Sequence, residues 1–161
     1  MKKNKQVRQN GLPTGKKMAL DLSVVSLILE ENGKLLLLKK AEKRGGEYTL
    51  VGGRVEKGES VLQALVRECR EEVGIDINPA DAHLVHVVHR RRQGQAIFHF
   101  FFYATIFVGT PDNCEPSKCS FLHWYDANAL PEPLLPAIKQ GIAAFQQNLL
   151  YSERGWTKFM K

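Results

Sequence analysis

The chain has 161 residues, a formal net charge of +6 and three cysteines. This length suits one domain with a core of its own. No apolar run reaches the roughly 18 residues of a membrane-spanning helix, no secretory leader is recognised, and an odd number of cysteines does not suggest a disulfide framework. We therefore expect a cytoplasmic protein without membrane association.

The basic character of the chain comes from its N-terminal segment. Residues 1–17 contain six Lys or Arg and no acidic residue, which accounts for the whole formal charge of +6. We expect a disordered, solubilising tail here. A basic stretch outside a folded domain is weak evidence for a nucleic-acid surface, so binding of nucleic acid is not expected.

Strand and helix patterns alternate along the rest of the chain. Residues 22–29 and 34–38 are rich in aliphatic residues and flank a Glu-Asn-Gly turn, which predicts two strands joined by that turn. Further strands are predicted at 49–51, 84–89, 96–107 and 120–125, and helices at 60–73 and 134–150. The pattern indicates one mixed α/β (α+β) domain over residues 18–150, followed by a C-terminal tail over residues 151–161.

The helix predicted at residues 60–73 carries an unusual group of acids. Ser60 suits its N-cap and Gly74 its C-cap. Glu68, Glu71 and Glu72 project from the side opposite its apolar stripe, at spacings where like charges repel. A hard divalent cation relieves such repulsion, and Mg²⁺ binds carboxylates together with substrate phosphates. The alternative is a solvated acidic face.

The acidic helix is part of a longer motif that begins at Gly53. The stretch resembles the Nudix box, G-x5-E-x7-R-E-U-x-E-E-x-G-U, where U is a bulky aliphatic residue. The fixed letters all match, at Gly53, Glu59, Arg67, Glu68, Glu71, Glu72 and Gly74. The one departure is Cys69 at the first aliphatic position, where a small apolar residue is not expected to impair function.

Resemblance to the Nudix hydrolases implies a fold and a chemistry. The fold is an α/β/α sandwich with a mixed central β-sheet. The chemistry is Mg²⁺-dependent hydrolysis of a diphosphate linked to another moiety, with Mn²⁺ as an alternative cation. The implied metal ligands are Glu68, Glu71, Glu72 and the carbonyl of Gly53, and Glu71 is also a candidate to activate water. Glu59 and Arg67 are implied as a supporting pair that orients the ligands.

A second pattern lies downstream of the box. The run from Glu115 to Cys119, followed by Trp124 and by Leu130-Pro131, resembles one that is common in Nudix enzymes of the nucleoside triphosphate pyrophosphohydrolase (mutator) type. In such enzymes a loop glutamate at this place can reach the metals. Glu115 is therefore a candidate catalytic residue, with an ordinary loop acid as the alternative.

Three further residues are candidates for substrate binding. Arg90 and Arg91 suit phosphate recognition, because a guanidinium can donate two parallel hydrogen bonds; a solvated hairpin end is the alternative. Leu134 aligns with the position at which mutator-type enzymes carry a purine-reading asparagine.

These features predict that the substrate is a nucleoside triphosphate or a modified form of one, cleaved to the monophosphate and pyrophosphate. Markers of ADP-ribose and dinucleoside polyphosphate hydrolases are missing from their expected places. A nucleotide sugar or a capped RNA remains an alternative substrate, and a non-catalytic nucleotide-sensing module is an alternative function. The resemblance leaves a homodimer open.

Overall fold

Strand β1 (Leu22–Glu31) lies at the centre of the fold. In the computed structural model, which describes residues 21–156, β1 runs parallel to β6 (Gln95–Ala104) and antiparallel to β4 (Val51–Arg54). Its last residues pair with β2 (Lys34–Lys40). The strand order is β3-β2-β1-β6-β5-β8, with β4 paired to β1 and β7 to β2. The remaining strands are β3 (Tyr48–Thr49), β5 (His83–Arg92), β7 (Cys119–Asp126) and β8 (Tyr151–Arg154).

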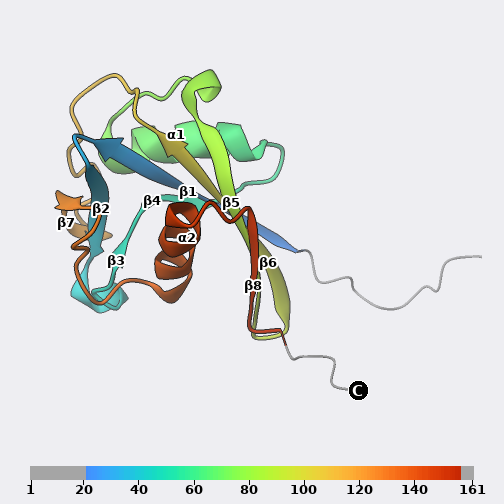
Figure 1. The fold of residues 1–161 in the computed structure, drawn as a ribbon. Helices are drawn as coiled ribbons and strands as arrows, with labels where there is room; N and C mark the ends of the chain where they lie inside the picture. Colours follow the sequence, from blue (N-terminus) through green and yellow to red (C-terminus); the bar gives the residue numbers. More distant parts are fainter. Residues whose placement is uncertain (1–20, 157–161) are drawn as a thin grey trace, which may run out of the picture.

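A helix covers each face of this sheet. Helix α1 (Val61–Val73) lies across one face and α2 (Pro136–Gln146) lies against the other, as Figure 1 shows. Two short 3-10 helices, η1 (Glu42–Arg44) and η2 (Pro79–Asp81), complete the elements. The predicted α/β/α sandwich with a mixed sheet is confirmed. Within residues 21–156 no helix is long and apolar enough to cross a membrane.

Alternate residues of β1 enter two separate cores. Val25 and Leu27 join the cluster beneath α1, whereas Ile28 joins the cluster beneath α2. Successive side chains of a strand point to opposite faces, so a strand with a helix on both sides needs apolar residues throughout. Ser26 interrupts this pattern on the α2 side, although it is buried. One strand therefore positions both faces of the molecule.

The predicted boundaries of α1 are confirmed. The Ser60 hydroxyl accepts a hydrogen bond from the Gln63 backbone N–H, and the Gln63 side chain accepts one from the Ser60 N–H. This reciprocal pair is a capping box. Gly74 ends the helix with a φ of 69°, a left-handed conformation that glycine adopts at little cost.

Two predicted boundaries near the C-terminus differ from the structure. Helix α2 spans residues 136–146 rather than 134–150, because Pro136 opens its first turn and the chain turns at residues 147–148 before it enters β8. The expected tail from residue 151 begins with β8, which pairs in parallel with β5. Beyond β8, the Trp156 indole donates a hydrogen bond to the His89 carbonyl. The basic tail predicted at residues 1–17 lies outside the described residues.

Gly141 is the point at which α2 approaches the sheet. A Cβ at this position would lie 2.3 Å from two ring carbons of Phe101, a side chain that is fully buried. We predict that Gly141→Ala lowers the free energy of unfolding by about 1–3 kcal/mol, because overpacking outweighs the gain of about 1 kcal/mol in helix propensity. Thermal denaturation measures this difference, and a higher melting temperature would contradict the prediction.

Candidate active site

Two adjacent glycines of β4 allow close contacts, Gly53 with helix α1 and Gly52 with strand β1. A Cβ on Gly53 would lie 2.2 Å from Glu68 Oε1, and a Cβ on Gly52 would lie 2.1 Å from the Val25 carbonyl oxygen. Each glycine therefore allows a contact that a larger residue would block. The Glu68 carboxylate lies against Gly53 on the α1 side, and the β4 backbone lies against β1 at Gly52.

Arg67 organises the carboxylates of the box. Its Nε and Nη2 donate to the two oxygens of Glu59, at 3.1 and 2.7 Å. Its Nη1 donates to Glu68 at 2.8 Å and to Glu71 at 3.1 Å, and Nη2 also donates to the Arg54 carbonyl. The fork on Glu59 fixes the guanidinium plane. Arg67 therefore sets the positions of the Glu68 and Glu71 carboxylates. Its hydrogen bond to Glu59 is also the largest cause of the lowered pKa of Glu59.

The three glutamates of α1 lie in different environments. The side chain of Glu71 is 51% exposed, whereas that of Glu68 is 13% exposed. Glu72 accepts a 2.8 Å hydrogen bond from the Gly52 backbone N–H. Burial, together with the charges of Glu68 and Glu115, raises the pKa of Glu72 to about 8, although the Gly52 hydrogen bond opposes this shift. Burial likewise raises the pKa of Glu68.

A loop from a distant part of the chain docks on the end of α1. The backbone N–H groups of Asp112 and Cys114 donate to the carbonyls of Val73 and Glu72, which are among the carbonyls that a helix leaves unpaired at its C-terminus. The Asn113 side chain accepts from the Glu115 N–H and donates to the Cys119 carbonyl. This docking brings Glu115 close enough to Glu72 to raise its pKa.

Glu115 is paired with a lysine at this position. Lys118 Nζ donates to Glu115 Oε1 at 2.6 Å. The other oxygen, Oε2, is buried and has no hydrogen-bond partner in the described structure. An orphaned buried carboxylate oxygen calls for a further partner, and a cation would suit this position because the charges of Glu115 and Glu72 repel one another.

The donors at this site fit a hard divalent cation. They are carboxylate oxygens, which Mg²⁺ prefers, and the pKa shifts show that their negative charges oppose one another. Across residues 21–156, no three His, Cys, Asp or Glu side chains form a complete metal cluster. Arg67 and Lys118 hold Glu68, Glu71 and Glu115 instead.

A cavity of about 530 Å³ lies on the opposite face of the sheet. Its wall includes Gly52 on β4, Ser26 on β1, His99 on β6 and the first residues of α2. Strand β4 pairs only with β1 among the described strands, so it forms an edge of the sheet between this cavity and helix α1. A ligand that passes over β4 can therefore reach both the cavity and the glutamates.

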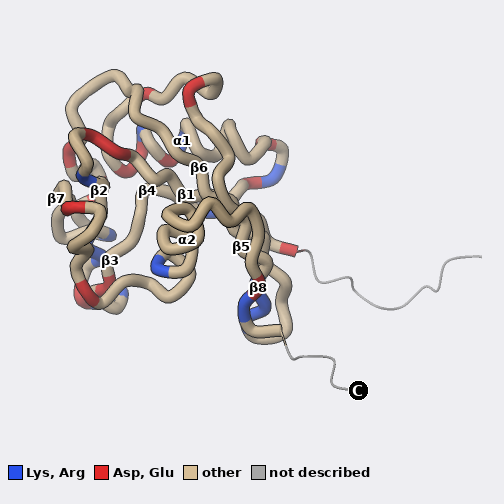
Figure 2. Tube along the Cα trace, viewed as in Figure 1, with Lys and Arg blue, Asp and Glu red and all other residues tan. Residues whose placement is uncertain are grey.

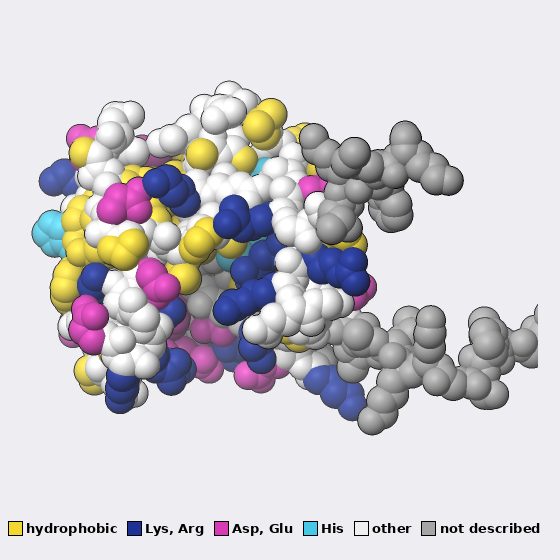
Figure 3. Space-filling view, turned by 90° about the horizontal axis from the view of Figure 1, so that it is seen from below, with side chains coloured by type: hydrophobic (Ala, Val, Ile, Leu, Met, Phe, Trp, Pro, Cys, Tyr) yellow, Lys and Arg dark blue, Asp and Glu magenta, His cyan; other side chains and the backbone are white. Residues whose placement is uncertain are grey.

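The rim of the cavity is basic. Arg90, Arg92, Arg154 and Lys40 contribute to its lining, and Glu47 is paired with Lys40 at 3.1 Å. Figure 2 shows the Lys and Arg residues near the ends of β5 and β8, and Figure 3 shows basic side chains gathered on the side of the molecule seen from below. Such a rim attracts anionic ligands.

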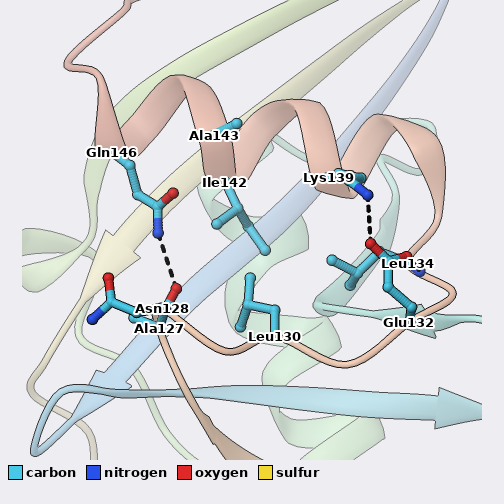
Figure 4. Close-up of a pocket in the computed structure, with 9 residues that line it drawn as sticks. All are labelled: Ala127, Asn128, Leu130, Glu132, Leu134, Lys139, Ile142, Ala143 and Gln146. Atoms are coloured by element: carbon cyan, nitrogen blue, oxygen red, sulfur yellow. Dashed lines mark hydrogen bonds and ion pairs between the residues drawn. The ribbon is translucent and has the colours of Figure 1, made fainter.

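The candidate substrate residues lie in three separate places. Arg90 lines the cavity. Arg91 does not; its guanidinium lies over the Trp156 ring, 5.6 Å from the centroid. Leu134 is buried and bridges to Tyr48, and it borders a different cavity between α2 and the preceding loop (Figure 4). Its neighbour Leu135 lines the cavity beside β4.

Sequence reasoning missed several residues of the site. Lys118 lies within the second motif, but the sequence does not show that it pairs with Glu115. Ser26 and His99 are polar residues within apolar strands, and that interruption was the available signal. Arg92 and Arg154 lie about sixty residues apart and meet only because β8 pairs with β5.

Comparison with known proteins agrees with this geometry. The NUDIX domain model matches residues 19–145. The chain is 34% identical to the CTP pyrophosphohydrolase of Escherichia coli over 72% of this chain and 84% of that protein. It is 33% identical to the NAD-capped RNA hydrolase NudC of Stutzerimonas stutzeri, over 83% of this chain but 46% of that protein.

A solved structure supports the same relationship. The MutT NUDIX hydrolase of Burkholderia pseudomallei superposes with a TM-score of 0.69 at 29% identity, covering 76% of this chain and 96% of that one. The chain therefore belongs to the Nudix hydrolase family, whose members hydrolyse phosphoric anhydrides and generally use a divalent metal such as Mg²⁺.

Proposed function

We propose that this protein is a Mg²⁺-dependent nucleoside triphosphate pyrophosphohydrolase that releases a nucleoside monophosphate and pyrophosphate. The observation that carries the proposal is the electrostatic proximity of three carboxylates, since the charges of Glu68 and Glu115, after burial, raise the pKa of Glu72. Similarity to a CTP pyrophosphohydrolase supports the substrate class. Modified nucleoside triphosphates belong to the same class.

The metal ligands in this proposal are Glu68, Glu72 and the Gly53 carbonyl, with Glu71 beside them. When bound, the cation neutralises phosphate charge and lowers the pKa of a coordinated water. In the reaction, water oxygen bonds to phosphorus, the bond from that phosphorus to the bridging oxygen breaks, and pyrophosphate leaves. Glu71 and Glu115 are the candidates to accept the proton of the water, since both lie within the acidic cluster.

The residues around the ligands position them. Arg67, braced by Glu59, holds Glu68 and Glu71 in place. Arg90, which lines the cavity beside β4, and Arg91, the next residue on β5, are the proposed arginine contacts to the substrate. Arg90 is the better placed, because the guanidinium of Arg91 lies over Trp156 instead. Leu134 is the remaining proposed substrate-binding residue, and its neighbour Leu135 lines the cavity beside β4.

We predict that Glu59→Gln weakens Mg²⁺ binding by about 10- to 100-fold, a usual cost of losing a partner of a metal ligand. Replacing one carboxylate oxygen with an amide breaks the fork that fixes Arg67. Activity measured against Mg²⁺ concentration gives the apparent affinity. Saturating Mg²⁺ should restore much of the activity, and an unchanged Mg²⁺ dependence would contradict the bracing role.

Glu115→Gln tests the loop carboxylate. We expect turnover to fall by about 10- to 100-fold, the range of a single proton-transfer group or of one weakened metal contact. Lys118→Met is the matched comparison, because it removes the partner of Glu115 but leaves the carboxylate. If both variants retained full turnover at saturating Mg²⁺, Glu115 would be an ordinary loop acid.

A substrate panel tests the proposed function itself. Ordinary and oxidised nucleoside triphosphates, nucleotide sugars, ADP-ribose, dinucleoside polyphosphates and capped RNA are each incubated with Mg²⁺ or Mn²⁺. ³¹P NMR then identifies the phosphate products. We expect nucleoside triphosphates to give monophosphate and pyrophosphate; hydrolysis confined to another substrate class would refute the proposed substrate. Binding without hydrolysis under every condition would instead indicate a nucleotide sensor.

A further inference from the structure

The cavity beside β4 has a neutral polar floor beneath its basic rim. Ser26 and His99 are each 3% exposed, and Ser26 Oγ lies 2.8 Å from His99 Nε2. Burial and the charge of Arg90 lower the pKa of His99 to about 3. The imidazole is therefore uncharged at neutral pH. Leu135, Pro136 and neighbouring residues of α2 complete an apolar wall.

Two buried nitrogen atoms at this cavity lack partners. His99 Nδ1 and Arg90 Nε have no hydrogen bond within the described residues, and both residues line the cavity. Buried polar atoms are nearly always paired. Two orphans on one cavity indicate that an occupant supplies the missing partners.

The hydrogen-bonding pattern of the pair follows from these contacts. Arg90 Nε can only donate. If His99 Nδ1 were also protonated, these two residues would bury two unpaired N–H donors, and orphaned N–H groups are the costlier kind. The favoured tautomer carries its proton on Nε2, which donates to Ser26 Oγ. His99 Nδ1 then accepts.

We propose that His99 and Arg90 recognise the amidine edge of a nucleobase, the ring nitrogen and adjacent amino group shared by cytosine and adenine. The ring nitrogen accepts from Arg90 Nε–H, and the amino group donates to His99 Nδ1. Uracil and hypoxanthine present N–H and carbonyl at the same places, the reverse pattern. Ser26 is the positioning residue, since it fixes the tautomer of His99. This inference rests on the proposed nucleotide substrate.

The charge distribution fits a nucleoside in this orientation. The uncharged floor and apolar wall suit a planar base, and the basic rim suits the phosphates attached to it. Gly52 lines the cavity, whereas the neighbouring Gly53 faces Glu68. A substrate with its base on His99 therefore passes over two residues without side chains to reach the glutamates.

Two matched substrate pairs test the preference. CTP and ATP carry the amidine edge. UTP and ITP are their counterparts with a lactam, a ring N–H beside a carbonyl, at the same place. We expect kcat/KM to favour the amidine member of each pair by about 10-fold or more, the usual discrimination of one paired edge. In His99→Leu both ratios should fall, because only the contact from Arg90 Nε–H to the ring nitrogen remains. His83→Leu is the control, because His83 is an exposed residue of β5 outside the cavity, and it should keep the wild-type ratios.

Ser26→Ala separates a positioning role from a structural one. Without the serine, His99 can take either tautomer. The kcat/KM for UTP and ITP should therefore rise, and both amidine-to-lactam ratios of kcat/KM should fall. ¹⁵N NMR of His99 should show an unprotonated Nδ1 in the wild-type protein and a mixture in Ser26→Ala. A protonated Nδ1 in the wild type, or ratios near one, would overturn the proposal. If His99→Leu does not fold, the kcat/KM ratios of the wild type and of Ser26→Ala still test the proposal.

Binding of products separates this inference from the proposed function. Calorimetry with CMP and UMP, without added metal, reports base recognition independently of turnover. Tighter binding of CMP supports the amidine edge even if no triphosphate is hydrolysed, in which case the proposed function alone fails. Hydrolysis of all triphosphates, with equal binding of CMP and UMP, refutes base recognition alone.

Discussion

Replacing Glu72 with glutamine is expected to lower turnover by about 1,000-fold or more while making the metal-free protein more stable at alkaline pH. The loss of turnover follows from the loss of a charged metal ligand, whose interaction is worth several kcal/mol. The fold should survive, because the glutamine side-chain oxygen can still accept the hydrogen bond from the Gly52 N–H.

The gain in stability follows from the pKa of the native carboxyl group. Burial raises the pKa of Glu72 from 4.5 to about 8 in the folded protein. A raised pKa means that the folded state favours the protonated form, so the stabilisation is fully present below about pH 4.5 and is lost as pH rises through about 8. The ionised carboxylate then costs on the order of 5 kcal/mol in the metal-free protein. Glutamine does not ionise and avoids this cost.

Melting temperatures between pH 5 and pH 9, with EDTA and with Mg²⁺, measure both effects. The wild type should lose stability toward pH 9 in EDTA and regain it with Mg²⁺, whereas Glu72→Gln should change little in either case. Glu71→Gln is the stability control, because its side chain is 51% exposed and solvent screens its charge. Near-normal turnover in Glu72→Gln, or an equal pH dependence of the two proteins, would remove Glu72 from the metal site.

Adding a methyl group to Gly53 is expected mainly to lower turnover, whereas adding one to Gly52 is expected mainly to lower stability. In Gly53→Ala the new Cβ meets the carboxylate of Glu68, the mobile end of a side chain. The carboxylate can move aside at a cost of about 1 kcal/mol or less, but a ligand displaced by 1 Å lowers turnover by about 100-fold.

In Gly52→Ala the new Cβ instead meets the backbone of Val25, and the φ of +146° at this position strains any larger residue. The free energy of unfolding should fall by about 3 kcal/mol or more. Chemical denaturation and turnover, measured on both variants, distinguish the two effects. Equal losses of stability would mean that Glu68 is held too rigidly at Gly53 to move aside.

The sequence was informative wherever the structure is local. The limits of α1 follow from Ser60 and Gly74, and the matched box identifies the glutamates, because spacing along one helix fixes which side chains share a face. Helix α2 was predicted too long, because leucines at helical spacing continue on both sides of a segment whose start is set by Pro136.

The parts of the site that depend on long-range pairing were not predictable in this way. The docking of the loop at residues 112–115 on α1 depends on backbone hydrogen bonds that carry no sequence signature. The sequence pattern does not predict strand β8, because four polar and aromatic residues give too short a pattern. The cavity floor joins Ser26 and His99 across 73 positions of the chain.

The alternation of β1 between two cores has a consequence for how such enzymes diverge. Odd-numbered residues such as Val25 and Leu27 support helix α1, and the even-numbered Val24 and Ser26 line the cavity. If the substrate binds as proposed, a substitution at Val24 or Ser26 would alter which molecule is accepted while the hydrolytic machinery stays intact. Chemistry and choice of substrate are independently adjustable on a single strand, which gives a physical route for one ancestral hydrolase to yield descendants with different nucleotide preferences.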